Sequence, residues 1–289
     1  MGKILFLRAT GLLFLTALLC TDPLHANGQI ENVPNPPRFK VEISGGFDYS
    51  TASLVDNHSI ITDQDGVVES DLTTDKAELR ALNRENIYKL MQQSVDLRFS
   101  YRVWNKLSVW AGIGVVSTSG KNRYPGTDEL RSKTASENPE LLLKGGLNYI
   151  HPLCHDLFVA IRPSIAYSST DNMLLTFYQN DESSIYRDYG MDRKVLRWEI
   201  PIVVGKNFGR FTPYVGAAYK DFKQTDRLNS RVSYIDEDYF LTITDIFHSR
   251  SKIHGVAGTT FRVAENIGVG VTAAFSHSIA AELSFHLSL

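Results

Sequence analysis

The sequence predicts an all-β fold, a transmembrane antiparallel up-and-down β-barrel of about ten strands. Three observations predict it. Apolar and polar residues alternate in runs of about ten residues, which is the pattern of a strand with two unlike faces. Short and long connections between these runs alternate along the chain. Thirteen tyrosines and fifteen phenylalanines stand beside twenty glycines, a composition that favours strands over helices.

The first 38 residues precede the predicted barrel. Lys3 and Arg8, the apolar run 11–20 and the small residue Ala26 together indicate a secretory signal peptide at residues 1–26. Residues 27–38 contain three prolines, so we expect an extended periplasmic lead-in there. No later apolar run approaches the roughly 18 residues of a transmembrane helix, and residues 39–289 are therefore predicted to form the barrel.

The first predicted strand, residues 39–49, places Val41 and Ile43 on one face and Glu42 and Asp48 on the other. The same alternation recurs at residues 95–103, 107–115, 141–149, 157–167, 197–204, 211–219, 253–263, 267–275 and 279–289. The runs 197–204 and 211–219 are the clearest pair. A short Asn/Gly turn joins them, which predicts a β-hairpin long enough to cross a tilted bilayer span.

The connections between these runs are of two kinds. Tight turns follow residues 103, 149, 204 and 263, whereas long polar segments occupy residues 51–85, 117–138, 169–194 and 220–250. Outer-membrane barrels have short periplasmic turns and long extracellular loops. A soluble β-sandwich has no such requirement, so the asymmetry favours a membrane barrel.

The two faces of the runs demand different surroundings. The apolar face needs lipid or a protein core, and the opposite face carries charges that need water or each other. A closed cylinder with lipid outside and a polar lumen satisfies both faces and pairs every backbone group. The charged residues on the inner face are Glu42, Asp96, Arg98, Arg102, Lys144, Arg162, Arg197, Glu199, Arg262 and Glu282.

Aromatic residues are predicted to gather at both ends of the lipid-facing surface, as in the girdles of membrane barrels. One end would carry Phe39, Phe211 and Phe261, and the other Tyr49, Tyr167, Trp198, Tyr219 and Phe275. Three prolines fit the pattern poorly. Pro163, Pro201 and Pro213 each remove a backbone donor from a barrel without a free edge, so we expect a bulge or break at each.

The chain resembles small bacterial outer-membrane β-barrel proteins of the OmpA-like, opacity-like and PorT-like type. The resemblance rests on the signal peptide, on the hairpin 198–219 with its Glu-Ile-Pro and Pro-Tyr-Val-Gly-Ala segments, and on the final alternation of Leu283, Phe285, Leu287 and Leu289. It implies location in the cell outer membrane. It also implies that the barrel-assembly machinery recognises the C-terminal strand, although Leu289 stands where such proteins usually end in Phe.

The candidate functional site is a network of charged residues in the lumen. Their positions along the runs put Asp96, Arg98, Lys144, Arg162, Glu199 and Glu282 near the middle of the membrane. A barrel of about ten strands has little interior beyond its own side chains, so the main hypothesis is a paired plug that closes the lumen. The alternative is a small, gated channel or transporter with a charged lumen.

We expect no enzymatic activity, cofactor or metal. The histidines are scattered, and the nearest approach to a catalytic set is His277 and Ser278 with Glu282, or Ser276 as the hydroxyl, which keeps a barrel hydrolase as a second alternative. Acidic residues between Asp63 and Asp71 are interpreted as a solvated loop and not as a calcium site. Cys154 is the only cysteine after the signal peptide, so no intramolecular disulfide is expected.

The expected partners follow from this location. They are the lipid and lipopolysaccharide of the outer membrane and the barrel-assembly machinery, and no nucleic acid, since the net charge is only −2. The segments 173–178 and 234–247 are unusually apolar for loops. They indicate either a surface patch for an extracellular protein partner or strands that continue beyond the membrane.

Overall fold

The computed structural model describes residues 39–63, 65–123, 130–136, 138–179, 182–234, 237–276 and 279–288. These residues belong to one compact unit, Pro37–Leu289. The predicted signal peptide and periplasmic lead-in lie outside the described residues, as does Leu289. Among the described residues, no helix is long and apolar enough to cross a membrane.

The described part of the chain is almost entirely strand. The strands are β1 (Phe39–Thr62), β2 (Val68–Thr73), β3 (Ile87–Trp104), β4 (Leu107–Arg123), β5 (Leu130–Ala135), β6 (Glu140–Pro152), β7 (Leu157–Ile161), β8 (Ser164–Gln179), β9 (Glu182–Lys206), β10 (Phe211–Tyr234), β11 (Glu237–Ser249), β12 (Ile253–Arg262), β13 (Ile267–Phe275) and β14 (Ile279–Ser288). One helix, α2 (Lys76–Glu85), lies between β2 and β3.

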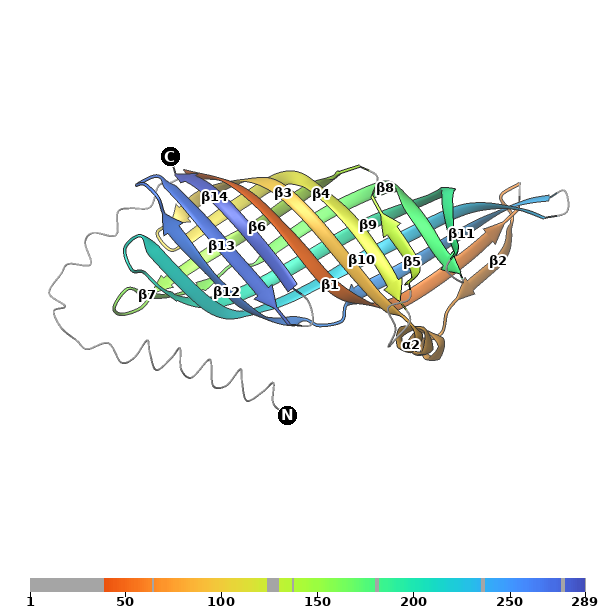
Figure 1. Cartoon of the computed structure of the whole chain (residues 1–289), viewed down its shortest axis with the longest axis horizontal. Helices are drawn as coiled ribbons and strands as arrows, with labels where there is room; N and C mark the ends of the chain where they lie inside the picture. The colour runs from red at the N-terminus through yellow and green to blue at the C-terminus, as the bar shows by residue number, and fades with distance from the viewer. Residues whose placement is uncertain are drawn as a thin grey trace. The chain divides into compact units, whose positions relative to one another are not determined.

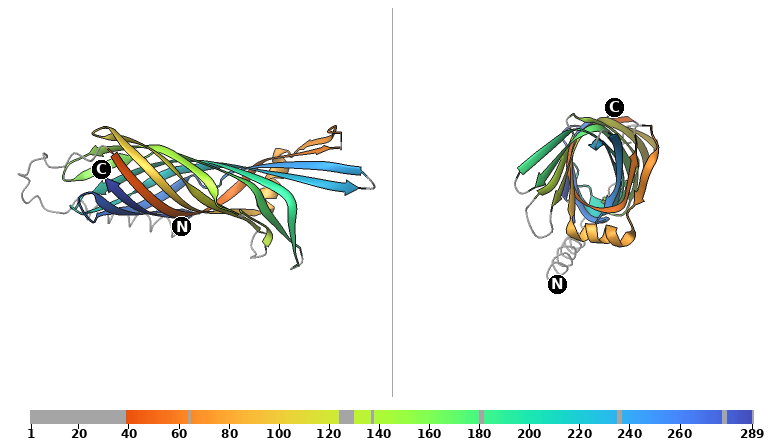
Figure 2. Two further views of the ribbon diagram at one scale, coloured as in Figure 1. Left: turned by 90° about the horizontal axis from the view of Figure 1, so that it is seen from above. Right: turned by 90° about the vertical axis from the view of Figure 1, so that its right-hand side faces the viewer.

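Antiparallel pairing closes these strands into a ring of ten. The ring runs β1, β3, β4, β6, the successive strands β7 and β8 as one position, β9, β10, β12, β13 and β14. It closes where β14 pairs with β1, from Lys40 opposite Ser288 to Tyr49 opposite Ile279. Figure 2 shows the closed ring end-on. The predicted up-and-down barrel of about ten strands is therefore confirmed.

The outer face of the ring is apolar and exposed. Val95 is 55% exposed, Leu141 56% and Leu283 59%, and each points away from the lumen. A soluble protein would not leave such a continuous apolar belt in water, whereas a membrane barrel presents it to lipid. Aromatic residues lie on this face near both ends, with Phe211 and Phe261 toward the short turns and Tyr167 and Tyr219 toward the long connections.

The long connections are mostly strand and not loop. β1 runs on to Thr62, and β10 and β11 form a long hairpin that continues the wall beyond the ends of β12, β13 and β14, toward the right in Figure 1. There β11 pairs with β1 on one side and with β10 on the other. In segments 173–178 and 234–247 the strands continue, as one of the two interpretations predicted, except at residues 235 and 236, which lie outside the described residues. A surface patch for an extracellular partner stays a prediction.

The helix α2 covers the place where β1 and β3 separate, beyond the pair Ala52 and Tyr88. Asp75 caps the helix by accepting hydrogen bonds from two backbone amides of its first turn, at 2.7 and 2.9 Å. Beyond that pair, the side chain of Asn83 makes the hydrogen bonds to β1 that a neighbouring strand would otherwise make. Its side-chain amide accepts from the backbone N–H of Leu54 at 2.9 Å and donates to the carbonyl of Leu54 at 2.7 Å.

The prolines behave differently from one another. The expected break occurs at Pro163, since β7 ends at Ile161 and β8 begins at Ser164. The prediction of a bulge or break at Pro201 and at Pro213 was wrong, because the register of β9 and β10 is continuous there. Pro201 lies opposite the break at Pro163, so the two missing donors share one gap, and Pro213 lies beyond the end of the β9–β10 pairing.

Candidate functional site

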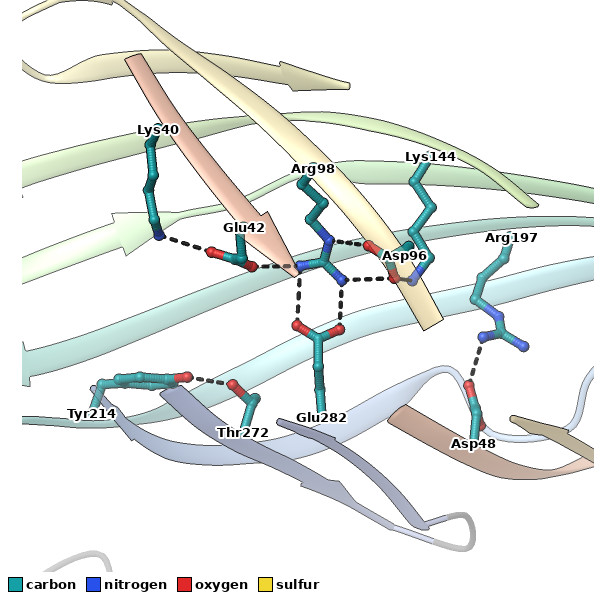
Figure 3. Close-up of polar contacts among 10 residues, drawn as sticks. All are labelled: Lys40, Glu42, Asp48, Asp96, Arg98, Lys144, Arg197, Tyr214, Thr272 and Glu282. Carbon is teal, nitrogen blue, oxygen red and sulfur yellow. Dashed lines mark hydrogen bonds and ion pairs between the residues drawn. The ribbon is translucent and has the colours of Figure 1, made fainter. Parts of the chain in front are cut away.

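The charged layer of the lumen nearer the short turns is centred on Arg98 of β3 (Figure 3). Arg98 donates from Nε to Asp96 Oδ1 at 2.6 Å and from Nη2 to Glu282 Oε2 at 2.7 Å. Its Nη1 donates to Glu282 Oε1 at 3.0 Å and to Glu42 Oε1 at 3.2 Å. Paired hydrogen bonds between a guanidinium and a carboxylate fix both position and orientation, so Arg98 ties β14 and β1 to β3 from inside.

Two lysines complete this layer. Lys144 of β6 donates to Asp96 Oδ2 at 2.5 Å, and Lys40 of β1 donates to Glu42 Oε2 at 2.8 Å (Figure 3). Three cations therefore face three carboxylates. The layer is electrically balanced, which is the condition for keeping charges away from bulk water.

A second charged layer lies further toward the long connections and is centred on Asp48 of β1. Asp48 accepts from Arg197 Nη1 at 2.8 Å and from the ammonium of Lys220, and Ser50 donates to its other oxygen at 3.1 Å. Arg197 also donates from Nη2 to the side-chain carbonyl of Gln92. Residues of β1, β3, β9 and β10 thus meet inside the ring, although β1 pairs with neither β9 nor β10.

An apolar layer follows above Asp48. Its centre is Phe222, which is 0% exposed. Helix α2 contributes Leu79 from the gap between β1 and β3. The buried members of this layer are Ala52, Leu54, Leu79, Leu90, Val195, Phe222 and Phe247. The side chains of this layer offer no polar atom that could replace the hydration shell of an ion.

A third polar layer lies beyond the apolar one. Arg193 donates from Nε and Nη2 to the two oxygens of Asp226, both at 2.7 Å, and from Nη2 to the hydroxyl of Thr134 at 3.2 Å. Gln224 donates to Asp226 at 2.9 Å. All four residues are buried, so this bidentate ion pair is held away from water.

Asp245 of β11 lies directly opposite Asp226 in this third layer. Asn57 donates to Asp245 Oδ1 at 2.5 Å. Burial, together with the neighbouring charge of Asp226, raises the pKa of Asp245 to about 6 against the opposing effect of the hydrogen bond from Asn57. This carboxyl, which lies in the part of the wall beyond β12, β13 and β14, therefore titrates near neutral pH.

Near the short turns, further inward-facing side chains contact one another. Tyr214 Oη and Thr272 Oγ1 are 2.5 Å apart (Figure 3), and the Arg162 guanidinium lies 5.2 Å from the centre of the Tyr214 ring. Arg98 lies at the same distance over the ring of Trp110. Ala160, Val203, Tyr214, Ala218, Val256 and Ala274 form a second buried apolar cluster.

The six residues of the predicted lumen network therefore have different places. Asp96, Arg98, Lys144 and Glu282 form one connected network, as the alternation suggested. Arg162 stacks on Tyr214 and has no ion pair with a described residue. Glu199 lies opposite Lys220 in the β9–β10 register and, within the described ranges, makes no ion pair.

The second layer was missed as a site. The alternation places Asp48 and Arg197 on the inner face, but neither was among the six candidate residues. Lys220 and Gln92 lie just outside the predicted runs 211–219 and 95–103, and extending the alternation by a few residues would have placed both side chains on the inner face. The sequence alone carries no sign of their partners.

The region of the predicted catalytic set contains another contact. Ser276 Oγ lies 3.0 Å from His254 Nδ1, and His254 Nε2 lies 3.0 Å from the carbonyl of Ser251. His277 and Ser278 lie outside the described residues. Glu282, the expected third member, points into the lumen and binds Arg98.

The acidic segment after β1 uses its carboxylates locally. Asp63 Oδ1 accepts from the backbone amides of Asp65 and Val67 at 3.0 and 2.7 Å and so fixes the turn between β1 and β2. Asp71 binds the imidazole of His58. Within the described ranges, no group of three or more His, Cys, Asp or Glu side chains is arranged to hold a metal ion.

The closed ring, its apolar outer face and its charged lumen define a transmembrane β-barrel of the outer-membrane type. No protein-family model and no curated protein matches the chain. Solved structures of outer-membrane barrels do share its architecture at low identity.

The translocator domain of the autotransporter NalP from Neisseria meningitidis is 8% identical with a TM-score of 0.41, over 97% of this chain and 96% of that one. The outer membrane protein OprG from Pseudomonas aeruginosa is 11% identical with a TM-score of 0.39, over 88% and 99%. The outer membrane protease OmpT from Escherichia coli is 7% identical with a TM-score of 0.36, over 85% and 94%. We draw no functional argument from likenesses of this size.

Proposed function

We propose that this chain is a non-enzymatic outer-membrane β-barrel with a closed lumen, which serves as a structural or surface-interaction protein. The observation that carries the proposal is the filling of the lumen at successive heights. A balanced charged layer centred on Arg98 and a second charged layer centred on Asp48 are followed by the apolar layer around Phe222. A solute would have to displace all three.

The charged layers would resist opening. The Arg98 contacts span β1, β3 and β14, and the Asp48 contacts span β1, β9 and β10, so parting the side chains breaks ion pairs on several strands at once. Breaking a buried pair by removing one partner costs about 3–5 kcal/mol. The Glu282 carboxylate, needed beside His277 in the hydrolase alternative, is one of these partners, which supports a structural role for it.

The same proposal includes location and assembly. The apolar belt supports insertion in the outer membrane, and β14 is the partner of β1 in closing the ring. The proposal is that the barrel-assembly machinery recognises β14. The extended β10–β11 hairpin and the β1–β2 hairpin are the parts that we propose present the protein to an extracellular partner.

A small channel remains the alternative, because several buried polar atoms make no hydrogen bond within the described residues. They include Ser44 Oγ, Arg193 Nη1, Arg197 Nε and Gln224 Oε1. Such atoms are usually satisfied by water. A chain of water molecules past the apolar layer would make the lumen conductive, so the two functions differ in one measurable property.

Single-channel recording in planar bilayers tests the proposal. The wild-type barrel should give no steady conductance. The triple variant Asp48→Ala, Arg98→Ala and Phe222→Ala should give stable openings, because it removes the centres of both charged layers and of the apolar layer. Phe285→Ala, which truncates a phenylalanine on the lipid-facing surface, is the matched control and should stay closed. Stable wild-type openings would overturn the closed-lumen proposal in favour of a channel.

A further inference from the structure

The strand register places three lysines side by side on the outer surface of the barrel. Lys89 of β3 lies opposite Lys121 of β4, and Lys121 lies opposite Lys133 of β5. Their neighbours Leu90 and Thr134 point inward and are buried, so the three lysines point outward. We refer to Lys89, Lys121 and Lys133 as the lysine row.

The lysine row is electrostatically unfavourable by itself. Like charges directly opposite each other on neighbouring strands destabilise the pairing. None of the ion pairs among the described residues involves a member of the row. An anion bound between the ammonium groups would remove the repulsion, so the arrangement favours a negatively charged ligand.

The height of the row identifies the surroundings of that ligand. Lys89 lies opposite Thr51, two residues beyond Tyr49 on β1, and its ammonium is 5.7 Å from the centre of the Tyr49 ring. Tyrosines of this kind mark the level of the lipid headgroups. The row therefore lies where the phosphate groups of outer-leaflet lipids are found, on the side of the long connections.

A shallow groove crosses the lipid-facing surface below the row. Outward-facing side chains of β1, β3, β4 and β14 line it, among them Phe47, Gln93, Val95, Val115 and Leu283. Gly45 is one of its lining residues and adds no side chain to it. A Cβ atom there would meet nothing closer than 3.8 Å.

The distance between the lysine row and the groove suits a single lipid molecule. Gln93 follows Lys89 by four residues on β3, which is about 13 Å at roughly 3.3 Å per residue. An acyl chain attached to a headgroup at the row would run down the same strands into the groove. A protein partner would have to enter the hydrocarbon core of the membrane to occupy the groove.

We propose that the lysine row and the groove at Gly45 together bind one phosphate-bearing, acylated lipid of the outer leaflet, with its phosphate on the lysines and one acyl chain in the groove. The ligand class is that of lipid A. The site lies wholly outside the lumen, so it goes beyond the proposed function and holds whether the lumen is closed or open.

The test is lipid binding to the purified, folded barrel in neutral detergent, followed by native mass spectrometry with bisphosphorylated lipid A. The wild type should retain one lipid. Lys121→Gln with Lys133→Gln should weaken binding about 30-fold, since each lysine near an anionic surface contributes roughly fivefold. Gly45→Leu should weaken it about tenfold, the effect of displacing roughly two methylene groups.

Each variant has a matched control. Lys194→Gln with Lys223→Gln removes two exposed lysines from β9 and β10, away from the groove. Gly145→Leu adds the same side chain on the lipid-facing surface of β6, where a Cβ would meet nothing closer than 3.6 Å. Both controls should bind lipid A like the wild type.

Three results would overturn the proposal. The control lysine pair could weaken binding as much as the row pair, which would show a general charge effect. Gly45→Leu could leave binding unchanged, which would remove the groove from the site. Inorganic phosphate could saturate the row at the same concentrations as lipid A, which would exclude a contribution from the acyl chain. If Gly45→Leu did not fold, the lysine pair and dephosphorylated lipid A, expected to bind at least tenfold more weakly, would still decide.

Discussion

Arg98 and Asp245 hold charge inside this barrel in two different ways. Arg98 has carboxylates on three sides, so its charge is compensated where it stands. Among the described residues, Asp245 has the amide of Asn57 as its one hydrogen-bond donor, and the like charge of Asp226 lies opposite it. The first residue therefore belongs to the proposed closure of the lumen, and the second is expected to make one part of the wall sensitive to pH.

The stability of the β10–β11 hairpin should fall as pH rises. The pKa of Asp245 is raised to about 6 in the fold, above its ordinary value of 3.8, so the folded state holds a proton that the unfolded chain has lost. Stability is therefore greatest below about pH 4 and decreases through pH 6. Hydrogen exchange of the β11 amides should be slower at pH 5 than at pH 7.5, after correction for intrinsic rates.

The variant Asp245→Asn should remove this pH dependence. At pH 7.5 it should raise the free energy of local opening of β11 by roughly 1–3 kcal/mol and so slow hydrogen exchange of the β11 amides. Asp56→Asn is the control, since Asp56 lies one residue before Asn57 and so on the opposite face of the sheet. An equal effect of both substitutions, or an unchanged pH dependence in Asp245→Asn, would show that another group titrates.

At the scale of elements, α2 shows how a helix can complete a sheet. The Leu54 backbone has lost its β3 partner, and the Asn83 side chain supplies both hydrogen bonds. Leu79 fills the space behind them as part of the apolar layer. The helix is thus part of the barrel wall and not an appendage of a loop.

The variant Asn83→Ala should weaken the contact between α2 and β1. It leaves a backbone donor and an acceptor of Leu54 unpaired, at a cost of about 1–3 kcal/mol each. We expect faster hydrogen exchange at Leu54 and faster proteolysis within residues 76–85. Arg80→Ala, on the exposed face of the same helix, should change neither. Unchanged exchange at Leu54 in Asn83→Ala would contradict the role assigned to the amide.

The sequence predicted the elements inside the membrane better than those beyond it. Within lipid, one face of each strand must be apolar, so alternation was visible and gave ten strands. Beyond the lipid that requirement ends, so the alternation does not predict the outer parts of β1, β4, β8, β9 and β10, and strand continuation was only one of two interpretations for segments 173–178 and 234–247. Pro163 was predicted correctly to break its strand, whereas Pro201 depends on which strand lies opposite, and composition carries no such information.

The candidate site was predictable to a similar degree. Alternation assigns a side chain to the lumen, which found Asp96, Arg98, Lys144 and Glu282. It does not assign a height, because height depends on the register between strands distant in sequence. Asp48 and Lys220 are 172 residues apart and meet only through the closed ring. The lysine row depends on register in the same way.

At the scale of the whole molecule, the orientation in the membrane can be measured with one residue. Cys154 is free and exposed in the short turn between β6 and β7, which should face the periplasm. A maleimide polymer too large for porins should label it only after the outer membrane is permeabilised. Asp65→Cys, in the β1–β2 turn at the opposite end, should be labelled in intact cells. Labelling of Cys154 in intact cells would reverse the assigned orientation.

Three strands of the wall end together where the barrel leaves the lipid. β12, β13 and β14 stop near Ile253, Phe275 and Ile279, while β1 and β10 continue for many residues and carry β11 between them. One strand therefore takes the place of three, and the ring tapers toward its outer end. A molecule approaching from outside the cell would meet a narrower mouth than ten strands would form.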